Sequence, residues 1–152
     1  YQWYEIKRNN GNIEINFEQE ELSRKKVIKF IEELVVKYKL NKNKIIVAGF
    51  SQGGILAEAV GLTAPEKVAG VACFSGRFIP ELKPMIKSKA QLQNKKIFLA
   101  HGTQDQLLPI NLAEENYKAL TELGLKVKFK KDAIGHSISA TLLKEFNLWL
   151  VE

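Results

Sequence analysis

Cysteine is almost absent from this sequence: Cys73 is the only one among 152 residues. A disulfide framework within the chain is therefore excluded, and a lone thiol fits a reducing compartment. Long apolar runs are missing too, since none approaches the roughly 20 residues that a membrane-spanning helix needs, and no signal-peptide pattern opens the chain. We therefore expect a soluble, cytoplasmic protein without integral membrane association, in which Cys73 is a buried strand residue.

Arginine is scarce although the chain is basic. The formal net charge is +6, yet of the 23 basic residues only Arg8, Arg24 and Arg77 are arginine. Because arginine is the usual bidentate reader of phosphates and base edges, this balance argues against a nucleic-acid partner. A surface of solvated lysines is the simpler interpretation. Aspartate and histidine are also few, with two of each, which shortens the search for catalytic groups.

Apolar patterning alternates between strands and helices along the chain. Continuous or alternating apolar runs predict strands at 45–48, 68–74, 96–100 and 125–130, whereas helical spacing predicts helices at 18–39, 55–60, 109–123 and 142–150. Residues 9–12 read as a turn, and residues 75–94, with two prolines, as a long connection. The alternation predicts an α/β fold with a mainly parallel sheet flanked by helices, in one domain covering residues 1–152.

The segment around Ser51 carries the clearest motif. Gly49-Phe50-Ser51-Gln52-Gly53-Gly54 lies between a predicted strand and a predicted helix, and Gly-x-Ser-x-Gly in that context predicts a nucleophile elbow. Such a turn exposes the serine hydroxyl above the sheet edge. It also leaves the backbone N–H of Gln52 at a helix start, where that N–H can stabilise a developing oxyanion.

Partners for Ser51 follow two later strands. Asp105 comes after a buried strand, whereas Asp132 lies in the basic stretch Lys130-Lys131-Asp132. His136 lies on a loop after the last strand, whereas His101 directly ends its own strand and reads as structural. Because the carboxyl ends of parallel strands share one sheet edge, we predict a triad in which His136 is the base and Asp105 orients it.

Other candidate site residues are fewer. Phe78, Leu107 and Leu108 are positioned to line an apolar acyl pocket near the triad, although each also fits an ordinary core position. No cluster of side chains has metal-ligand spacing, and no glycine-rich phosphate loop is present. We therefore expect no cofactor and no metal.

These motifs resemble those of one known family. The elbow, then His101-Gly102-x-x-Asp105-x-x-Leu108-Pro109 and Gly135-His136-Ser137, preceded by Trp3-Tyr4, resemble the phospholipase/carboxylesterase family that includes acyl-protein thioesterases. The resemblance runs from about Trp3 to Leu150. It implies an α/β-hydrolase fold, hydrolysis of carboxylic esters or thioesters, and a triad of Ser51, Asp105 and His136.

The resemblance also shows one departure. Family members carry early strands and a His-Gly-rich loop ahead of the Trp-Tyr motif, and that loop supplies a second oxyanion N–H. None of this is present in the 152 residues. We therefore expect residues 45–48 to form a sheet edge that these 152 residues leave uncovered. An N-terminal segment or a second copy of the chain would then cover this edge.

Two functions follow as hypotheses. The first is a serine hydrolase that cleaves an acyl ester or thioester, small or lipid-like, through an acyl-enzyme on Ser51. The second is a truncated, non-catalytic binding or assembly module on a hydrolase scaffold, which the missing oxyanion loop favours.

Overall fold

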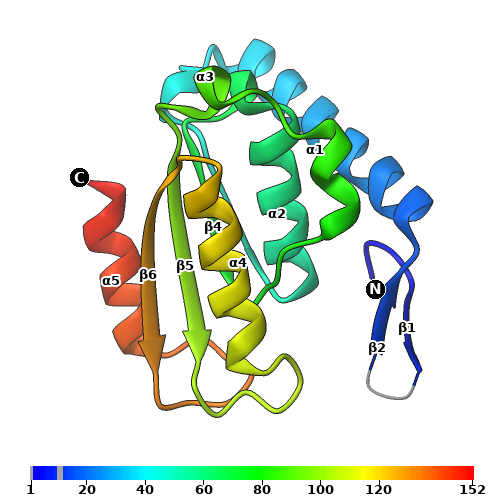
Figure 1. Cartoon of the computed structure of the whole chain (residues 1–152). Helices are drawn as coiled ribbons and strands as arrows, with labels where there is room; N and C mark the ends of the chain where they lie inside the picture. Colours follow the sequence, from blue (N-terminus) through cyan, green and yellow to red (C-terminus); the bar gives the residue numbers. More distant parts are fainter. Residues whose placement is uncertain (1, 10–11) are drawn as a thin grey trace.

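A parallel four-stranded sheet forms the centre of the protein in this computed structural model, which describes residues 2–9 and 12–152. The strands lie in the order β3-β4-β5-β6, so the chain adds each new strand beside the previous one (Figure 1). Their bounds are β3 (Ile46–Phe50), β4 (Gly70–Phe74), β5 (Lys96–Gly102) and β6 (Lys126–Asp132). The predicted α/β class is confirmed, and no strand end differs from its prediction by more than two residues.

Helices cover both faces of this sheet. The long helices are α1 (Phe17–Tyr38), α2 (Gln52–Thr63), α4 (Ile110–Glu122) and α5 (Ala140–Leu150). On one face Val71, Ile97 and Leu99 pack with residues of α1, α2 and α4. On the other face Phe74 and Phe98 pack against α5. Each predicted helix is therefore present, and successive residues of β4 and β5 alternate between the two cores.

The connection between β4 and β5 differs from its prediction. We expected residues 75–94 to be a long irregular loop, but they contain a 3-10 helix (Pro80–Met85) and the short helix α3 (Lys89–Leu92). Ile79, Leu82 and Leu92 are buried. The two prolines, which suggested a loop, both lie in this 3-10 helix, and Pro80 is its first residue, where an N–H would have no partner within the helix.

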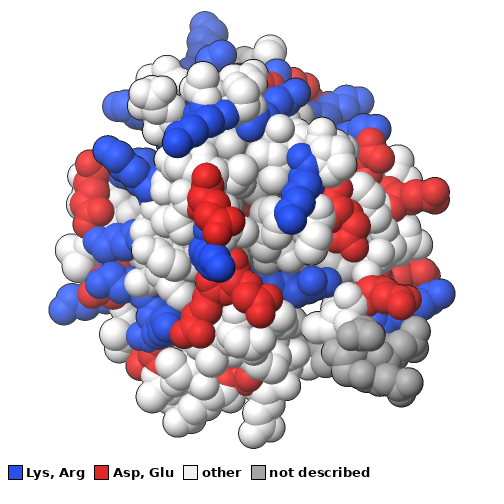
Figure 2. Space-filling view, in the orientation of Figure 1, with Lys and Arg blue, Asp and Glu red and all other residues white. Residues whose placement is uncertain are grey.

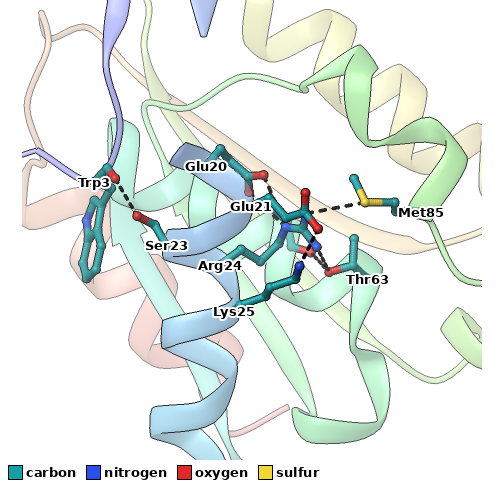
Figure 3. A network of polar contacts seen from close by, with 9 residues as sticks. Trp3, Glu20, Glu21, Ser23, Arg24, Lys25, Thr63 and Met85 are labelled. Atoms are coloured by element: carbon teal, nitrogen blue, oxygen red, sulfur yellow. Dashed lines mark hydrogen bonds and ion pairs between the residues drawn. The ribbon is translucent and has the colours of Figure 1, made fainter. Parts of the chain in front are cut away.

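A β-hairpin precedes α1 and was not predicted. Strands β1 (Ile6–Asn9) and β2 (Asn12–Ile15) pair antiparallel, and the tip of the predicted turn, residues 10 and 11, lies outside the described residues. The base of the hairpin is attached to α1, since the Ser23 hydroxyl donates to the Trp3 carbonyl at 2.5 Å (Figure 3). The hairpin thereby becomes part of the main body.

Strand β3 is the outer strand of the sheet, as the sequence led us to expect. Within the described residues it pairs with β4 alone. A groove of about 720 Å³ runs along it, lined by β3 and by apolar residues of α1 that include Phe30, Ile31 and Leu34. Phe30 is exposed. The apolar positions of α1 are thus only partly covered, which sequence periodicity alone could not show.

Two glutamate carboxyl groups lie in the interior. Glu20 pairs with Arg24 in α1, and the Arg24 guanidinium reaches Thr63 at the end of α2 (Figure 3). Glu58, in the middle of α2, is fully buried and accepts a hydrogen bond from Asn116 of α4 at 2.7 Å. Burial raises the pKa of Glu58 to about 8, and the Asn116 bond only partly opposes this rise.

The surface carries both signs of charge. Figure 2 shows lysine and arginine side chains interspersed with aspartate and glutamate on the face it presents, rather than one continuous basic area. In the described part of the chain, no helix has the combination of length and apolar character required to cross a bilayer.

Candidate active site

Ser51 occupies a strained turn between β3 and α2. Its φ of 53° and ψ of −121° lie outside the regions that serine ordinarily adopts. The turn requires glycine at its flanks: a Cβ on Gly49 would overlap the carbonyl of Gly53, and a Cβ on Gly54 would lie 2.9 Å from the Gly49 oxygen. The strand and helix therefore approach closely enough to lift Ser51 above the sheet edge.

Three predicted residues meet at that edge. His136 Nε2 lies 2.9 Å from Ser51 Oγ, and His136 Nδ1 lies 2.7 Å from Asp105 Oδ2. Asp105 follows β5 and His136 follows β6, so residues separated by up to 85 positions are brought together by parallel strands that end at one rim. The Phe50 ring packs beside the imidazole, with ring centroids 4.8 Å apart.

Asp105 is held as a carboxylate by its surroundings. Burial alone would raise its pKa, but the N–H of Leu108, the His136 imidazole and the N–H of Leu107 together hold the pKa below its ordinary value. The two amides donate to Oδ1 at 2.8 and 2.9 Å. Oδ2 is thus left to accept from His136, which fixes the imidazole orientation and leaves Nε2 facing the hydroxyl.

The remaining aspartate and histidine have other contacts. His101 is buried at the end of β5, where its Nε2 lies 2.8 Å from the Leu108 carbonyl oxygen and 3.4 Å from Asp105 Oδ2. It therefore braces the turn that carries Asp105. Asp132 accepts hydrogen bonds from Ser139 and from the Ala133 N–H, and so orders the start of the loop that leads to His136.

Gln52 begins α2 directly after Ser51. Within the described residues its backbone N–H meets no acceptor, so the group is free to face a developing oxyanion. Its side chain binds the start of the chain: Oε1 accepts from the Trp3 N–H and Nε2 donates to the Tyr4 carbonyl, both at 2.7 Å. This contact ties the residue after the proposed nucleophile to the backbone that leads into the hairpin.

A small cavity of about 30 Å³ adjoins Ser51. Leu107 and Leu108 line it, together with Arg77 and isoleucines of β1 and β2. Their role in an acyl pocket stays a prediction. Phe78 does not line it; the Phe78 ring packs against the larger core cluster instead and borders a separate hollow. Sequence reasoning missed Arg77 and the hairpin. Alternating Ile13-Glu14-Ile15 beside an Asn-Gly pair was the available signal for the hairpin.

Within the described ranges, the side chains are not arranged for metal binding or for thiol chemistry. No cluster of three or more histidine, cysteine, aspartate or glutamate side chains is placed to hold a metal ion there. Cys73 is buried in β4, and burial raises the pKa of its thiol well above the ordinary value. The groups arranged for reaction are a hydroxyl, an imidazole and a carboxylate, which together suit acyl transfer.

The strand order and the strand-to-helix turn at Ser51 are those of the α/β-hydrolases. The crystal structure of Arabidopsis thaliana SOBER1 superposes with a TM-score of 0.84 at 26% identity, covering 99% of this chain and 72% of that one. The crystal structure of esterase PE8 superposes with a TM-score of 0.83 at 23% identity, covering 99% and 69%. The α/β-hydrolase fold is therefore established.

Sequence comparison then gives the family. Residues 1–150 match the phospholipase/carboxylesterase family, to which this chain belongs. Acyl-protein thioesterase 1 of Eremothecium gossypii is 30% identical over 148 residues, covering 94% of this chain and 61% of that protein. A rice protein (Oryza sativa subsp. japonica), probable inactive carboxylesterase Os04g0669700, is 33% identical over 112 residues, covering 72% and 45%. The chain spans about half the length of the first curated relatives it matches.

Proposed function

We propose that residues 1–152 form one hydrolase domain that cleaves carboxylic esters or thioesters through an acyl-enzyme on Ser51. The observation that carries this proposal is the continuous contact from Asp105 through His136 to the Ser51 hydroxyl, with separations of 2.7 and 2.9 Å. Membership of the phospholipase/carboxylesterase family supports it. Because the single cysteine is buried as a free thiol, we expect the protein in a reducing compartment, the cytoplasm.

The proposed reaction has two halves. In the first, Ser51 Oγ attacks the acyl carbonyl carbon while His136 Nε2 takes the hydroxyl proton, and the Gln52 N–H stabilises the oxyanion. The leaving alcohol or thiol departs with the proton from His136. In the second, His136 takes a proton from water as the water attacks the acyl carbon. The acid is released, and the proton returns to Ser51. Asp105 stabilises the imidazolium at each step.

A non-catalytic module remains the alternative. By the family resemblance a second oxyanion donor comes from a segment outside these 152 residues, and loss of one such donor costs about 10²–10³ in rate. A related rice protein is named probably inactive. We therefore expect turnover by these 152 residues alone to be slow, and the test must detect single-turnover acylation.

The test uses a fluorophosphonate probe and 4-nitrophenyl butyrate. The wild-type chain should be labelled once and should release nitrophenolate, and Ser51→Ala should lose both activities. Ser88→Ala, a serine that begins α3 away from the triad, is the matched control and should keep both. If the wild-type chain is neither labelled nor active, the binding-module alternative is favoured; if Ser51→Ala is labelled as strongly as wild type, the nucleophile is misassigned.

A further inference from the structure

Arg77 lines the cavity beside Ser51 but has no role in the proposed reaction. It follows β4 in the segment Ser75-Gly76-Arg77 and lines the cavity that Ser51, Gln52, Leu107 and Leu108 also line. Its Nη2 donates to the Ile13 carbonyl of β2 at 3.2 Å. A guanidinium has five N–H donors, and this one bond leaves most of them available.

The charge of Arg77 is not compensated by the protein. Within residues 2–9 and 12–152 no carboxylate lies within ion-pairing distance of it, and residues 1, 10 and 11 are Tyr, Asn and Gly, which carry none. Its Nε is buried without a hydrogen-bond partner. Arg24, in contrast, is buried, pairs with the Glu20 carboxylate and donates to the Thr63 hydroxyl. Arg77 as a whole is half-buried, so it is the unpartnered Nε–H, rather than the whole charge, that costs free energy until an acceptor reaches it.

Neighbouring polar atoms are left open in the same way. Ser75 Oγ, two residues before Arg77, is buried with no partner, and so is the hydroxyl of Tyr4. Burial and the Glu20 carboxylate raise the pKa of the Tyr4 phenol, and the Arg77 guanidinium only partly opposes this rise. Of these residues only Arg77 lines the cavity beside Ser51. Its guanidinium N–H groups are hydrogen-bond donors, so a negatively charged acceptor in the cavity would satisfy those that the Ile13 carbonyl leaves open.

The apolar lining strengthens such an interaction. Ile6, Ile13, Ile15 and Ile55 surround the cavity, and a charge pair in a low-dielectric surrounding is stronger than one in water. At about 30 Å³ the cavity holds about one water molecule. A carboxylate or phosphate therefore requires the β1–β2 hairpin to move outward, and Arg77 itself holds this hairpin through Ile13.

We propose that Arg77 is a specificity-determining residue that binds an anionic group, a carboxylate or a phosphate, carried by the ester or thioester that Ser51 cleaves. The identity of the ligand as an ester or thioester substrate rests on the proposed hydrolase function. The presence of an anion site at Arg77 does not. Preference for an anionic acyl or alcohol group should thus depend on Arg77, whereas cleavage of neutral esters should not.

Two matched substrate pairs test the preference and locate the anion. Mono-4-nitrophenyl succinate against 4-nitrophenyl butyrate places a carboxylate on the acyl side, and 4-acetoxybenzoate against its methyl ester places one on the alcohol side. In Arg77→Gln the amide can still donate to the Ile13 carbonyl, but the charge is lost. We expect kcat/KM for the anionic member of one pair to fall about 10- to 100-fold relative to its neutral counterpart.

Ser23→Ala is the control variant, because it releases another hairpin attachment, the bond to the Trp3 carbonyl, without touching Arg77. The anionic-to-neutral ratio should be unchanged in Ser23→Ala. A ratio that is equally unchanged in Arg77→Gln overturns the proposal, and a ratio that falls equally in both variants assigns the effect to the hairpin and overturns it too.

A binding measurement separates this inference from the hydrolase proposal. The chain has only three arginines, so the arginine Nε–H region of a nitrogen–proton spectrum holds three signals, and Arg77→Gln identifies one. In the Ser51→Ala chain, glutarate or inorganic phosphate should shift that signal saturably, beyond the effect of sodium chloride at equal ionic strength. A shift without any ester turnover supports the anion site while the hydrolase proposal fails; turnover without a shift or a substrate preference overturns the anion site alone.

Discussion

Glu58→Gln should remove a large part of the pH dependence of folding stability. The Glu58 carboxyl is fully buried in α2, and its pKa rises from 4.5 to about 8 in the folded chain, chiefly through burial. Between these pH values the folded chain keeps a proton that the unfolded chain has released. The unfolded state is therefore favoured increasingly as the pH rises from 4.5 to 8.

The size of the effect follows from the same two pKa values. At about 1.36 kcal/mol for each pH unit, the wild-type chain loses about 5 kcal/mol of unfolding free energy across this window and about 3 kcal/mol by pH 7. Glutamine has no proton to release and so escapes this loss. Its amide can also donate to Asn116 Oδ1, which is buried without a partner, as a protonated Glu58 can.

The assay is urea unfolding followed by far-UV circular dichroism at pH 5, 7 and 8.5. The unfolding free energy of Glu58→Gln minus that of the wild type should grow with pH, from near zero at pH 5 to about 3–5 kcal/mol at pH 8.5. Glu122→Gln, on the exposed side of α4, should show no such growth. A Glu58→Gln difference that stays flat over this range would refute a neutral buried carboxyl.

Three further substitutions have defined outcomes. Gly49→Ala places a Cβ on the Gly53 carbonyl and should lower the unfolding free energy by about 2–4 kcal/mol; an unchanged urea midpoint would contradict the close approach at the elbow. Ser75→Gly relieves a left-handed residue with φ 50° and should raise stability by about 0.5–1 kcal/mol, whereas a loss would mean that Ser75 is not strained. Asp105→Asn should lower kcat for 4-nitrophenyl butyrate by about 10³–10⁴ with little change in KM; a change confined to KM would assign Asp105 to binding.

The elbow and the sheet could be predicted because local patterns specify them. A strand, Gly-x-Ser-x-Gly and a helix form within a few consecutive residues, so short-range sequence determines the Ser51 turn. The approach of Asp105 and His136 to Ser51 follows from a second general rule, that parallel strands end at one rim. Both steps need only the order of elements along the chain.

The hairpin and the inner polar groups could not be predicted in this way. Strands β1 and β2 have only four residues each, too few for a clear periodicity, so the Asn-Gly pair between them was the local signal for a hairpin. Arg77 and Asn116 look like surface residues in the sequence, and only tertiary packing shows that polar atoms of each are buried. Glu58 did leave a signal: it is the only charged residue between Ser51 and Ala64, and a lone charge in an apolar helix indicates burial.

The two hydrogen bonds between Gln52 and the Trp3-Tyr4 backbone place an intrinsic fluorophore, the Trp3 indole, close to Ser51. Trp3 is half exposed and lines the same groove as Ser51, whereas Trp149, the other tryptophan, lies on the buried face of α5 against Phe98 and Phe146. Trp3 should therefore emit at a longer wavelength than Trp149, because its indole is in contact with water. A change in the long-wavelength emission, which comes from Trp3, would report displacement of the amino-terminal strands. The short-wavelength emission of Trp149 would serve as an internal reference, so that no dye is needed.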